Sequence, residues 1–153
     1  MNIIKDVFFD LDRTLWDFDK NSESALRVLY EELKLNHYSA SFEEFLKGYR
    51  DVNARYWNDY GAGKIDKTQL RNGRFVDTLK SFEVNDDKLG KTMGERYLQI
   101  SPYQTHLFPS TKEVLTDLKN KNYPLHIITN GFKEVQFPTL ENSGLIHFFD
   151  VIL

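Results

Sequence analysis

The sequence predicts an α/β protein in which a Rossmann-like parallel sheet is interrupted by an all-helical insertion. Three short apolar segments are typical of strands, one near the N-terminus, one at 125–129 and one at 149–153. Helical periodicity fills most of the chain between the first two segments, and helices alternate with strands after residue 101. Because alternating helices and strands form parallel sheets, all three strands are expected to share one sheet.

The N-terminal strand is indicated by apolar residues that predict a short, buried segment: Ile4, Val7, Phe8 and Phe9. Four helices are expected in the insertion. Their expected ranges are 22–34, 41–61, 66–79 and, beginning near Asn85, 85–100. The N-terminal caps expected for the first three are Asn21 or Ser22, Ser41 with Glu44, and Asp66 with Gln69. Glycines end the second helix and a proline follows the fourth.

Two further helices are expected in the second half of the chain. The first covers 110–120 and is expected to open with a capping box formed by Ser110 and Glu113. The second covers 133–142, where Pro138 predicts a kink or a restart of the helix. A glycine caps its end.

The composition is that of an ordinary globular protein, with 41% apolar residues, 28% charged residues and a net charge of −3 over 153 residues. This balance attracts neither nucleic-acid polymers nor an anionic membrane, so neither is expected as a partner. The absence of cysteine excludes disulfides, thiolate catalysis and cysteine-ligated metals. Because no apolar run would span a bilayer and the first strand begins at once, we expect a cytoplasmic protein.

Two aspartates follow the first strand. Asp10 and Asp12 are two positions apart, so their side chains leave the strand on the same side. Neighbouring carboxylates repel each other and disfavour each other's ionisation, a cost that a divalent cation relieves. Magnesium suits such a site because it is a hard ion that takes oxygen ligands. For a bare pair of this kind, a polar strand end without function is the alternative.

The segment Asp10-Leu-Asp12-Arg-Thr14 behind an apolar strand resembles the first motif of the haloacid dehalogenase (HAD) superfamily of phosphohydrolases. The resemblance implies that Asp10 is a magnesium-binding nucleophile that becomes an aspartyl-phosphate. It also implies that Asp12 is the general acid and base and binds the metal through its backbone carbonyl, and that Thr14 supports the loop. The chemistry agrees, because a carboxylate that attacks a phosphate anion needs a nearby cation and a proton carrier.

A second candidate motif, Thr129-Asn130-Gly131, closes the strand at 125–129 and precedes a helix. Backbone N–H groups at a helix start favour anions, and glycine lets the backbone approach a ligand closely. Ligands of open α/β sheets bind where the strands end. The stretch resembles the second HAD motif, which implies that these residues hold the phosphoryl oxygens. Alone, it is also compatible with a plain turn.

The predicted organisation is a Rossmann-like core formed by residues 1–17 and 102–153, with a helical insertion at 18–101. It is similar to the HAD layout, in which a helical cap follows the first motif. The resemblance implies a lysine and a further acidic motif downstream, which the chain does not reach before Leu153. We therefore expect little or no turnover from these 153 residues. The edge of the first strand should be unpaired and open to self-association.

The residues around the first motif indicate one subfamily of the HAD superfamily. Most of the superfamily carries glycine after the second aspartate, whereas Arg13 and Trp16 match the subfamily that dephosphorylates pyrimidine nucleoside monophosphates. The expected function is magnesium-dependent hydrolysis of a small phosphorylated substrate, a nucleoside 5′-monophosphate of the pyrimidine type. The alternatives are another phosphatase or a phosphomutase of the superfamily, and a non-catalytic fragment that only binds a partner or a metal.

The insertion carries aromatic and basic side chains that offer base stacking and phosphate contacts: Tyr56, Trp57, Tyr60, Arg71 and Arg74. Aromatic residues at helical spacing more often belong to a hydrophobic core, and arginines more often belong to a solvated face. We therefore favour a place in the core for the three aromatic residues and on a solvated face for the two arginines, over a role in substrate binding.

Overall fold

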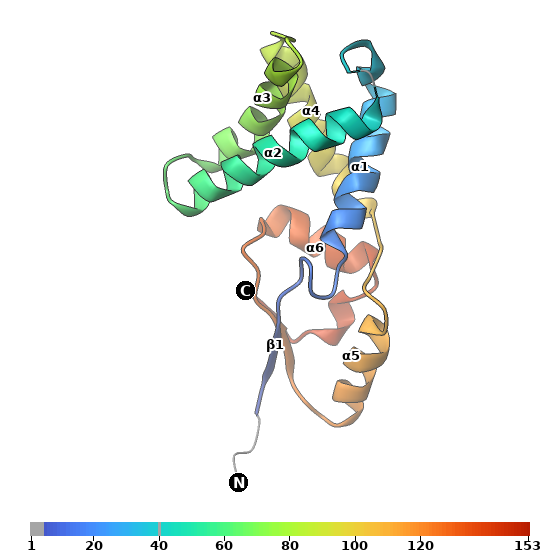
Figure 1. Cartoon of the computed structure of the whole chain (residues 1–153). Coiled ribbons are helices and arrows are strands. Elements are labelled where there is room, and N and C mark those ends of the chain that lie inside the picture. The colour runs from blue at the N-terminus through green and yellow to red at the C-terminus, as the bar shows by residue number, and fades with distance from the viewer. Residues whose placement is uncertain (1–4, 40) are drawn as a thin grey trace. The chain divides into compact units, whose positions relative to one another are not determined.

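The computed structural model describes residues 5–39 and 41–153. The chain divides into two compact units (Figure 1). The core unit comprises Met1–Ser22, as far as it is described, together with Ser101–Leu153. The helical unit comprises Glu23–Ile100. The first helix of the chain therefore begins in the core unit and continues into the helical unit.

The core unit contains the predicted parallel sheet. Its described strands are β1 (Val7–Phe9), β2 (Leu125–Ile127) and β3 (Val151–Ile152), in the order β1-β2-β3. Both pairings are parallel, and the register places Phe9 opposite Ile127, which in turn lies opposite Ile152. The carboxyl ends of all three strands therefore meet at one edge of the sheet, which is where both candidate motifs begin.

The prediction of a buried first strand is wrong for Phe8, which is 52% exposed; Ile4 lies outside the described residues. The register puts Phe8, His126 and Val151 in one row on one face of the sheet. In the described chain, the apolar core packs against the opposite face. An unbroken apolar run predicted burial on both faces, whereas this part of the chain covers one.

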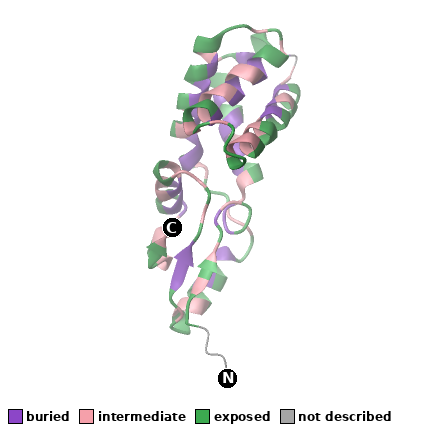
Figure 2. Ribbon diagram, turned by 90° about the vertical axis from the view of Figure 1, so that its left-hand side faces the viewer, coloured by how far each residue is buried: buried purple, intermediate pink, exposed green. Residues whose placement is uncertain are grey.

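The core of this unit joins the sheet to helices α5 (Thr111–Asn120) and α6 (Lys133–Asn142). Its fully or nearly buried members are Leu11, Leu15, Trp16, Leu115, Leu125, Ile127, Leu140 and Leu145. Three short 3₁₀ turns complete the described chain: Leu35–His37, Ser101–Tyr103 and Ile146–Phe148. Figure 2 colours the chain by burial, and β2 is buried throughout.

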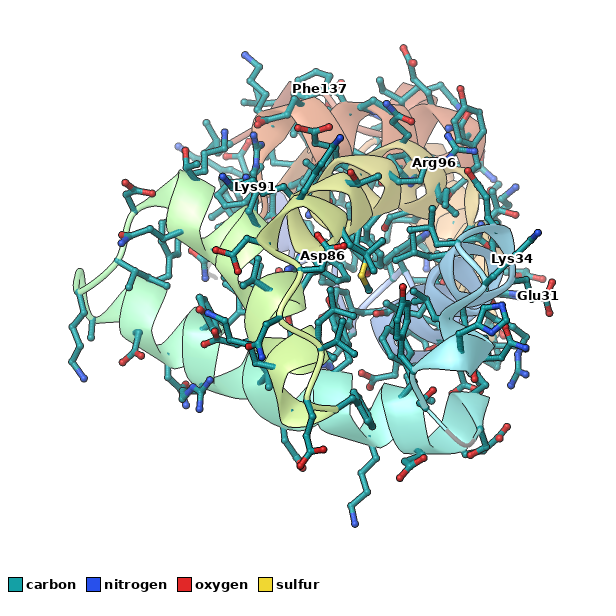
Figure 3. The ribbon with its side chains drawn as sticks, turned by 90° about the horizontal axis from the view of Figure 1, so that it is seen from above. Glu31, Lys34, Asp86, Lys91, Arg96 and Phe137 are labelled. Carbon is teal, nitrogen blue, oxygen red and sulfur yellow. The ribbon has the colours of Figure 1, made fainter. Side chains whose placement is uncertain are left out.

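The helical unit confirms the prediction of a helical insertion. Its elements are most of α1 (Phe18–Glu32), α2 (Phe42–Gly61), a π-helical segment (Gln69–Gly73), α3 (Arg74–Ser81) and α4 (Asp87–Ile100). Aromatic and aliphatic side chains from all four α-helices form one core, whereas charged side chains such as Glu31, Lys34 and Lys91 lie at its surface (Figure 3). Within the described residues, no helix combines the length and apolar character needed to cross a bilayer.

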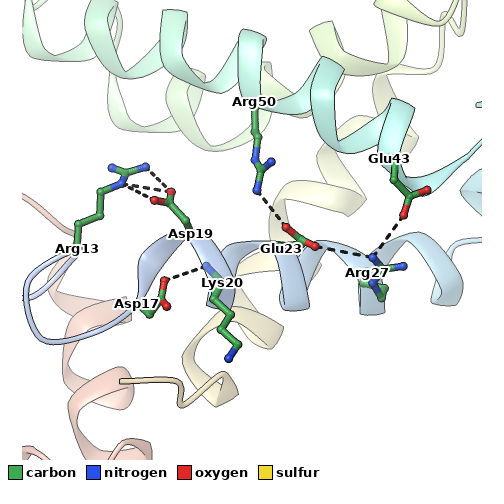
Figure 4. Close-up of polar contacts among 8 residues, drawn as sticks. All are labelled: Arg13, Asp17, Asp19, Lys20, Glu23, Arg27, Glu43 and Arg50. Atoms are coloured by element: carbon green, nitrogen blue, oxygen red, sulfur yellow. Dashed lines mark hydrogen bonds and ion pairs between the residues drawn. The ribbon is translucent and has the colours of Figure 1, made fainter. Parts of the chain in front are cut away.

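Ion pairs join α1 to α2 in the helical unit. Glu23 accepts from Arg50 at 3.1 Å, and Arg27 lies 3.8 Å from Glu23 and 3.6 Å from Glu43 (Figure 4). The Arg27 guanidinium also stacks over the Phe42 ring at 3.9 Å. Because these groups are exposed, we expect each pair to contribute less than about 1 kcal/mol.

Two of the N-terminal caps predicted in the insertion are confirmed. The Ser41 hydroxyl accepts a hydrogen bond from the Glu44 N–H at 3.1 Å. Asp66 and Gln69 exchange reciprocal bonds of 2.8 Å, as a capping box requires. The fourth helix, expected to begin near Asn85, begins at Asp87, and the Asp86 carboxylate accepts from the Leu89 N–H.

Two other caps were predicted wrongly. Ser110 has φ 61°, a left-handed conformation, and makes no side-chain cap bond, because an N-cap side chain reaches the first turn from extended backbone. Helix α1 begins at Phe18, four residues early, with the Asp17 carboxylate accepting from the Lys20 N–H at 3.1 Å (Figure 4). Asn21 is buried instead and exchanges two hydrogen bonds with the His106 backbone.

Helix α6 runs through Pro138 as one segment, so the restart, one of the two predicted outcomes, does not occur. Proline removes the bond to the carbonyl four residues earlier, which here belongs to Glu134 in the first turn, so only one bond is lost. The predicted glycine cap is confirmed. Gly144 has φ +66°, and the Leu145 N–H donates to the Leu140 carbonyl at 2.8 Å.

Candidate active site

The first candidate loop is built around the buried residue Leu11. Its carbonyl accepts from the Leu15 and Trp16 N–H groups, both at 3.0 Å, which folds the chain into a tight turn. Because Leu11 is fully buried, its neighbours on either side point the other way: Asp10 is exposed and Asp12 is half-buried. The alternation of a strand therefore continues past β1 and sets both carboxylates on one side.

Asp10 and Thr14 contact each other across this turn. The Thr14 hydroxyl donates to Asp10 Oδ2 at 3.2 Å. The bond engages one carboxylate oxygen, and the Asp10 residue remains exposed. This arrangement suits a nucleophile, because an exposed carboxylate oxygen can approach an electrophilic phosphorus atom.

Arg13 adopts a left-handed backbone conformation, with φ 64°. Its guanidinium donates to both oxygens of Asp19, at 2.8 and 3.2 Å, and stacks over the Phe18 ring at 4.6 Å (Figure 4). The hydrogen bond to Asp19 raises the pKa of Arg13. The structure thus gives a physical reason why a glycine would fit this position, since glycine adopts positive φ without strain.

Asp12 is held by a residue that the sequence analysis did not single out. Gln136, on α6, donates from Nε2 to Asp12 Oδ2 at 3.0 Å. Burial raises the pKa of Asp12; the Gln136 hydrogen bond opposes that shift, and the nearby charge of Asp10 adds to it. The two aspartates are therefore close enough to interact electrostatically. A polar residue four positions before the buried Leu140 was the available signal for Gln136.

The second candidate loop lies beside the first. Phe9 accepts at its carbonyl from the Ile128 N–H at 2.9 Å, so Asp10 and the residues after Ile128 leave adjacent parallel strands together. The Thr129 hydroxyl accepts from the Gly131 N–H at 3.0 Å. Asn130 is exposed and Thr129 is half-buried. The Gly131 N–H, expected to face a ligand, is thus directed into its own loop.

The donor chemistry of the aspartate pair fits a magnesium ion. The Asp10 carboxylate and the Asp12 backbone carbonyl offer oxygen ligands, and Mg²⁺ is commonly bound by one or two carboxylates while it keeps several waters. Burial and, to a lesser extent, repulsion from Asp10 raise the pKa of Asp12, and a cation would relieve that repulsion. Among the described residues, no cluster of three or more acidic, histidine or cysteine side chains is placed to hold a metal.

The insertion's aromatic and basic groups have structural partners inside the helical unit. Arg74 is only 6% exposed, so its expected place on a solvated face is wrong. Its guanidinium donates to Asn53 Oδ1 at 2.7 Å and lies 5.2–5.9 Å from three aromatic rings, those of Tyr49, Phe75 and Tyr97.

Two neighbours of Arg74 are constrained as well. The Tyr56 hydroxyl donates to Asp77 at 2.9 Å, and burial raises the pKa of Tyr56 to about 12. Arg71 is half-buried on the π-helical segment, where burial and the charge of Arg74 lower its pKa. Trp57 and Tyr60 lie edge to face with their ring centroids 6.0 Å apart. These contacts agree with a structural role for the buried aromatic and basic residues of the insertion.

The chain thus combines a parallel sheet, whose first strand is followed by two carboxylates, with a helical insertion after that strand. Residues 4–153 match the family model of the haloacid dehalogenase-like hydrolases, and the chain belongs to that family.

Two curated relatives share similar levels of identity with the chain. It is 30% identical over 148 residues to the pyrimidine 5′-nucleotidase PynA of Streptococcus pneumoniae, covering 97% of this chain and 60% of the relative. It is 31% identical over 147 residues to the pyrimidine 5′-nucleotidase YjjG of Escherichia coli, covering 96% of this chain and 60% of the relative. The chain therefore spans about three fifths of the length of these relatives.

A solved structure shares the fold of the chain. The HAD-hydrolase YfnB of Bacillus subtilis, bound to magnesium, superposes with a TM-score of 0.86 at 26% identity. The superposition covers 99% of this chain and 63% of YfnB. The predicted fold class, a Rossmann-like core with a helical insertion, is thereby confirmed.

Proposed function

We propose that this chain forms part of a magnesium-dependent phosphohydrolase that acts on pyrimidine nucleoside 5′-monophosphates. The observation that carries the proposal is the exposed Asp10 carboxylate, bonded to Thr14, at the end of the strand beside the Thr129 loop. Relatives named pyrimidine 5′-nucleotidases, at 30% and 31% identity, support the substrate class. In this proposal, residues 18–101 act as a cap on a core formed by residues 1–17 and 102–153.

In the first chemical step, an Asp10 oxygen attacks phosphorus, the bond between phosphorus and the ester oxygen breaks, and an aspartyl-phosphate forms. Asp12 gives its proton to the departing ester oxygen, so the nucleoside leaves as an alcohol. Burial favours the protonated form of Asp12, because it raises the pKa of that carboxyl group. The half-buried Asp12 and the exposed Asp10 are thereby suited to different roles.

In the second step, Asp12 takes a proton from a water molecule that attacks the phosphorus of the aspartyl-phosphate. The Asp10 carboxylate is released with inorganic phosphate, and Asp12 is again protonated. Asp10 is thus regenerated as the nucleophile, and the two steps together consume one water.

The second loop is proposed to hold the phosphoryl oxygens. Because the Thr129 oxygen already accepts from the Gly131 N–H, the Thr129 hydroxyl proton is directed elsewhere and can be donated to a phosphoryl oxygen. The exposed Asn130 amide supplies a second donor. Asp10 through its carboxylate and Asp12 through its backbone carbonyl would hold Mg²⁺, which neutralises the repulsion between the nucleophile and the phosphate when bound.

Phosphate release from uridine 5′-monophosphate, in the presence of Mg²⁺, tests the proposal. The assay is performed on these 153 residues and on a chain extended to the length of the relatives. We expect turnover from the longer chain, little from the shorter one, and a preference for uridine over adenosine monophosphate.

Asp10→Asn should abolish turnover in the active chain, because the nucleophile is lost. Asp51→Asn is the matched control, since Asp51 is exposed on α2 and lies outside the candidate site. Equal activity of Asp10→Asn and wild type would refute the assignment of the nucleophile. Activity on other phosphate esters alone would favour a different phosphatase of the family.

A further inference from the structure

Gln136 is a buried polar side chain that the proposed mechanism has not yet used. It lies in the first half of α6, is 5% exposed, and contacts a carboxylate 124 positions earlier in the chain. Its Nε2 donates to Asp12 Oδ2 at 3.0 Å. Both residues belong to the core unit.

The surroundings of Gln136 argue against a purely structural role. Its Oε1 is buried and has no hydrogen-bond partner among the described residues. A buried acceptor without a partner destabilises the folded state. A methionine would fill a similar volume without a polar atom. Among the described residues, the Gln136 side chain forms one hydrogen bond, to Asp12, against the cost of this unpaired oxygen.

Gly131 provides the space that Gln136 occupies. A Cβ atom at Gly131 would lie 1.8 Å from Gln136 Nε2 and 2.6 Å from its Cδ atom, far inside contact distance. Gly131 is absent from the described residues with positive φ, so its backbone conformation does not demand glycine. The need is steric: the amide passes directly over the Gly131 backbone on its way to Asp12.

We propose that Gln136 is a positioning residue for the proposed phosphohydrolase reaction, on which this inference rests. By donating to Oδ2, the amide fixes the Asp12 carboxyl group in one orientation. A protonated Asp12 then carries its proton on Oδ1. That proton passes to the ester oxygen as the bond to phosphorus breaks, and Oδ1 recovers a proton from the attacking water. Gln136 touches neither substrate nor phosphorus.

The test compares two substrates that differ in their need for a proton donor, using the full protein with Mg²⁺. The leaving group of uridine 5′-monophosphate is a poor alkoxide that requires protonation, whereas p-nitrophenyl phosphate releases a stable phenolate. For Gln136→Met, the single-turnover rate of leaving-group release from uridine 5′-monophosphate at saturating substrate should fall about 10- to 100-fold. On p-nitrophenyl phosphate we expect that rate to fall by less than about threefold, because general-acid assistance contributes little to the first step there.

Two further variants complete the design. Gln136→Leu has a similar size but no donor, so it should give the same substrate-dependent loss. Thr139→Val is the matched control, because Thr139 is buried on the same helix and its hydroxyl donates only within α6, to the Val135 carbonyl. It should leave the ratio of the two leaving-group release rates unchanged.

The outcomes separate this inference from the proposed function. An equal fall of the leaving-group release rate on both substrates, no fall, or loss of folding in both Gln136 variants would overturn the positioning role alone. A wild-type protein that hydrolyses neither substrate would overturn the proposed function and this inference together. Asp12→Asn should reproduce the substrate-dependent loss of leaving-group release, which ties the effect to the proton that Asp12 carries.

Discussion

Arg13 and Asp19 face each other across the turn that leads out of β1, joined by bonds of 2.8 and 3.2 Å. The pair holds a residue whose backbone is left-handed, at φ 64°. A residue other than glycine in that backbone conformation lowers the stability by about 1–2 kcal/mol, whereas an exposed ion pair contributes less than about 1 kcal/mol. The pair therefore does not offset the strain by itself.

Arg13→Gly and Arg13→Ala separate these two effects. Both variants lose the ion pair, but only glycine relieves the backbone strain, so Arg13→Gly should be more stable than Arg13→Ala by about 1 kcal/mol. The midpoint of urea unfolding measures the difference. Equal midpoints would show that the backbone at residue 13 relaxes once the side chain is removed.

Gly90 on α4 packs directly against the backbone of Val76. A Cβ atom at Gly90 would lie 2.8 Å from Val76 Cα and 2.9 Å from its nitrogen, and neither backbone atom can move alone. Gly90→Ala should therefore destabilise the helical unit by about 1–3 kcal/mol in urea unfolding. Gly61→Ala is the control, because no atom lies within 4 Å of a Cβ there. A neutral Gly90→Ala would contradict this packing.

Arg74 tests whether a buried cation is needed for folding. Arg74→Met should stay within about 1 kcal/mol of wild type, because an apolar side chain of similar length suits the surrounding rings. Arg74→Ala should cost about 2–5 kcal/mol through the cavity that it leaves. Thermal unfolding of both variants provides the comparison. A Met variant as unstable as the Ala variant would show that the hydrogen bond to Asn53, rather than packing, stabilises this site.

Asp150 links the starts of β2 and β3. Its carboxylate accepts from Lys119 and from the Leu125 N–H, each at 3.1 Å, and these bonds, Lys119 first, lower its pKa. Because the pKa of Asp150 is lower in the folded state, its ionised carboxylate stabilises the fold at pH values above the ordinary pKa of 3.8. That stabilisation is lost as the pH falls through the lower pKa of the folded state. The wild type should thus be more stable than Asp150→Asn near neutral pH, and the two should converge in acid.

Urea midpoints of wild type and Asp150→Asn, recorded from neutral pH downward, check this dependence. Asp117→Asn serves as a matched control, because Asp117 also pairs with an exposed lysine, Lys121, but lies outside the sheet. A difference between wild type and Asp150→Asn that persists at the lowest pH would contradict the electrostatic explanation.

Magnesium binding by Asp10 and Asp12 predicts a stability change without any substrate. An ion that binds only the folded state at a hundred times its Kd adds about 2.7 kcal/mol. Excess Mg²⁺ should raise the Tm of the wild type, and it should raise that of Asp51→Asn equally. The double variant Asp10→Asn, Asp12→Asn should not respond. An equal increase in the double variant would place the ion elsewhere.

The sequence by itself determined the features that depend on near neighbours. The reciprocal cap of Asp66 and Gln69 needs only a three-residue spacing. The apolar strand and the positions of Asp10 and Asp12 follow from side chains that alternate along extended backbone. Parallel pairing followed from the order of helices and strands, because connections between parallel strands are restricted.

Only the tertiary structure decided which distant side chains meet. It placed Gln136 against Asp12, buried Arg74 among aromatic rings, left Phe8 exposed and bonded Asn21 to the backbone of His106. Each outcome depends on which surface packs against a residue from far along the chain. Local periodicity and capping patterns carry no information about that surface, because burial and hydrogen bonding across the core depend on the packing of the whole unit.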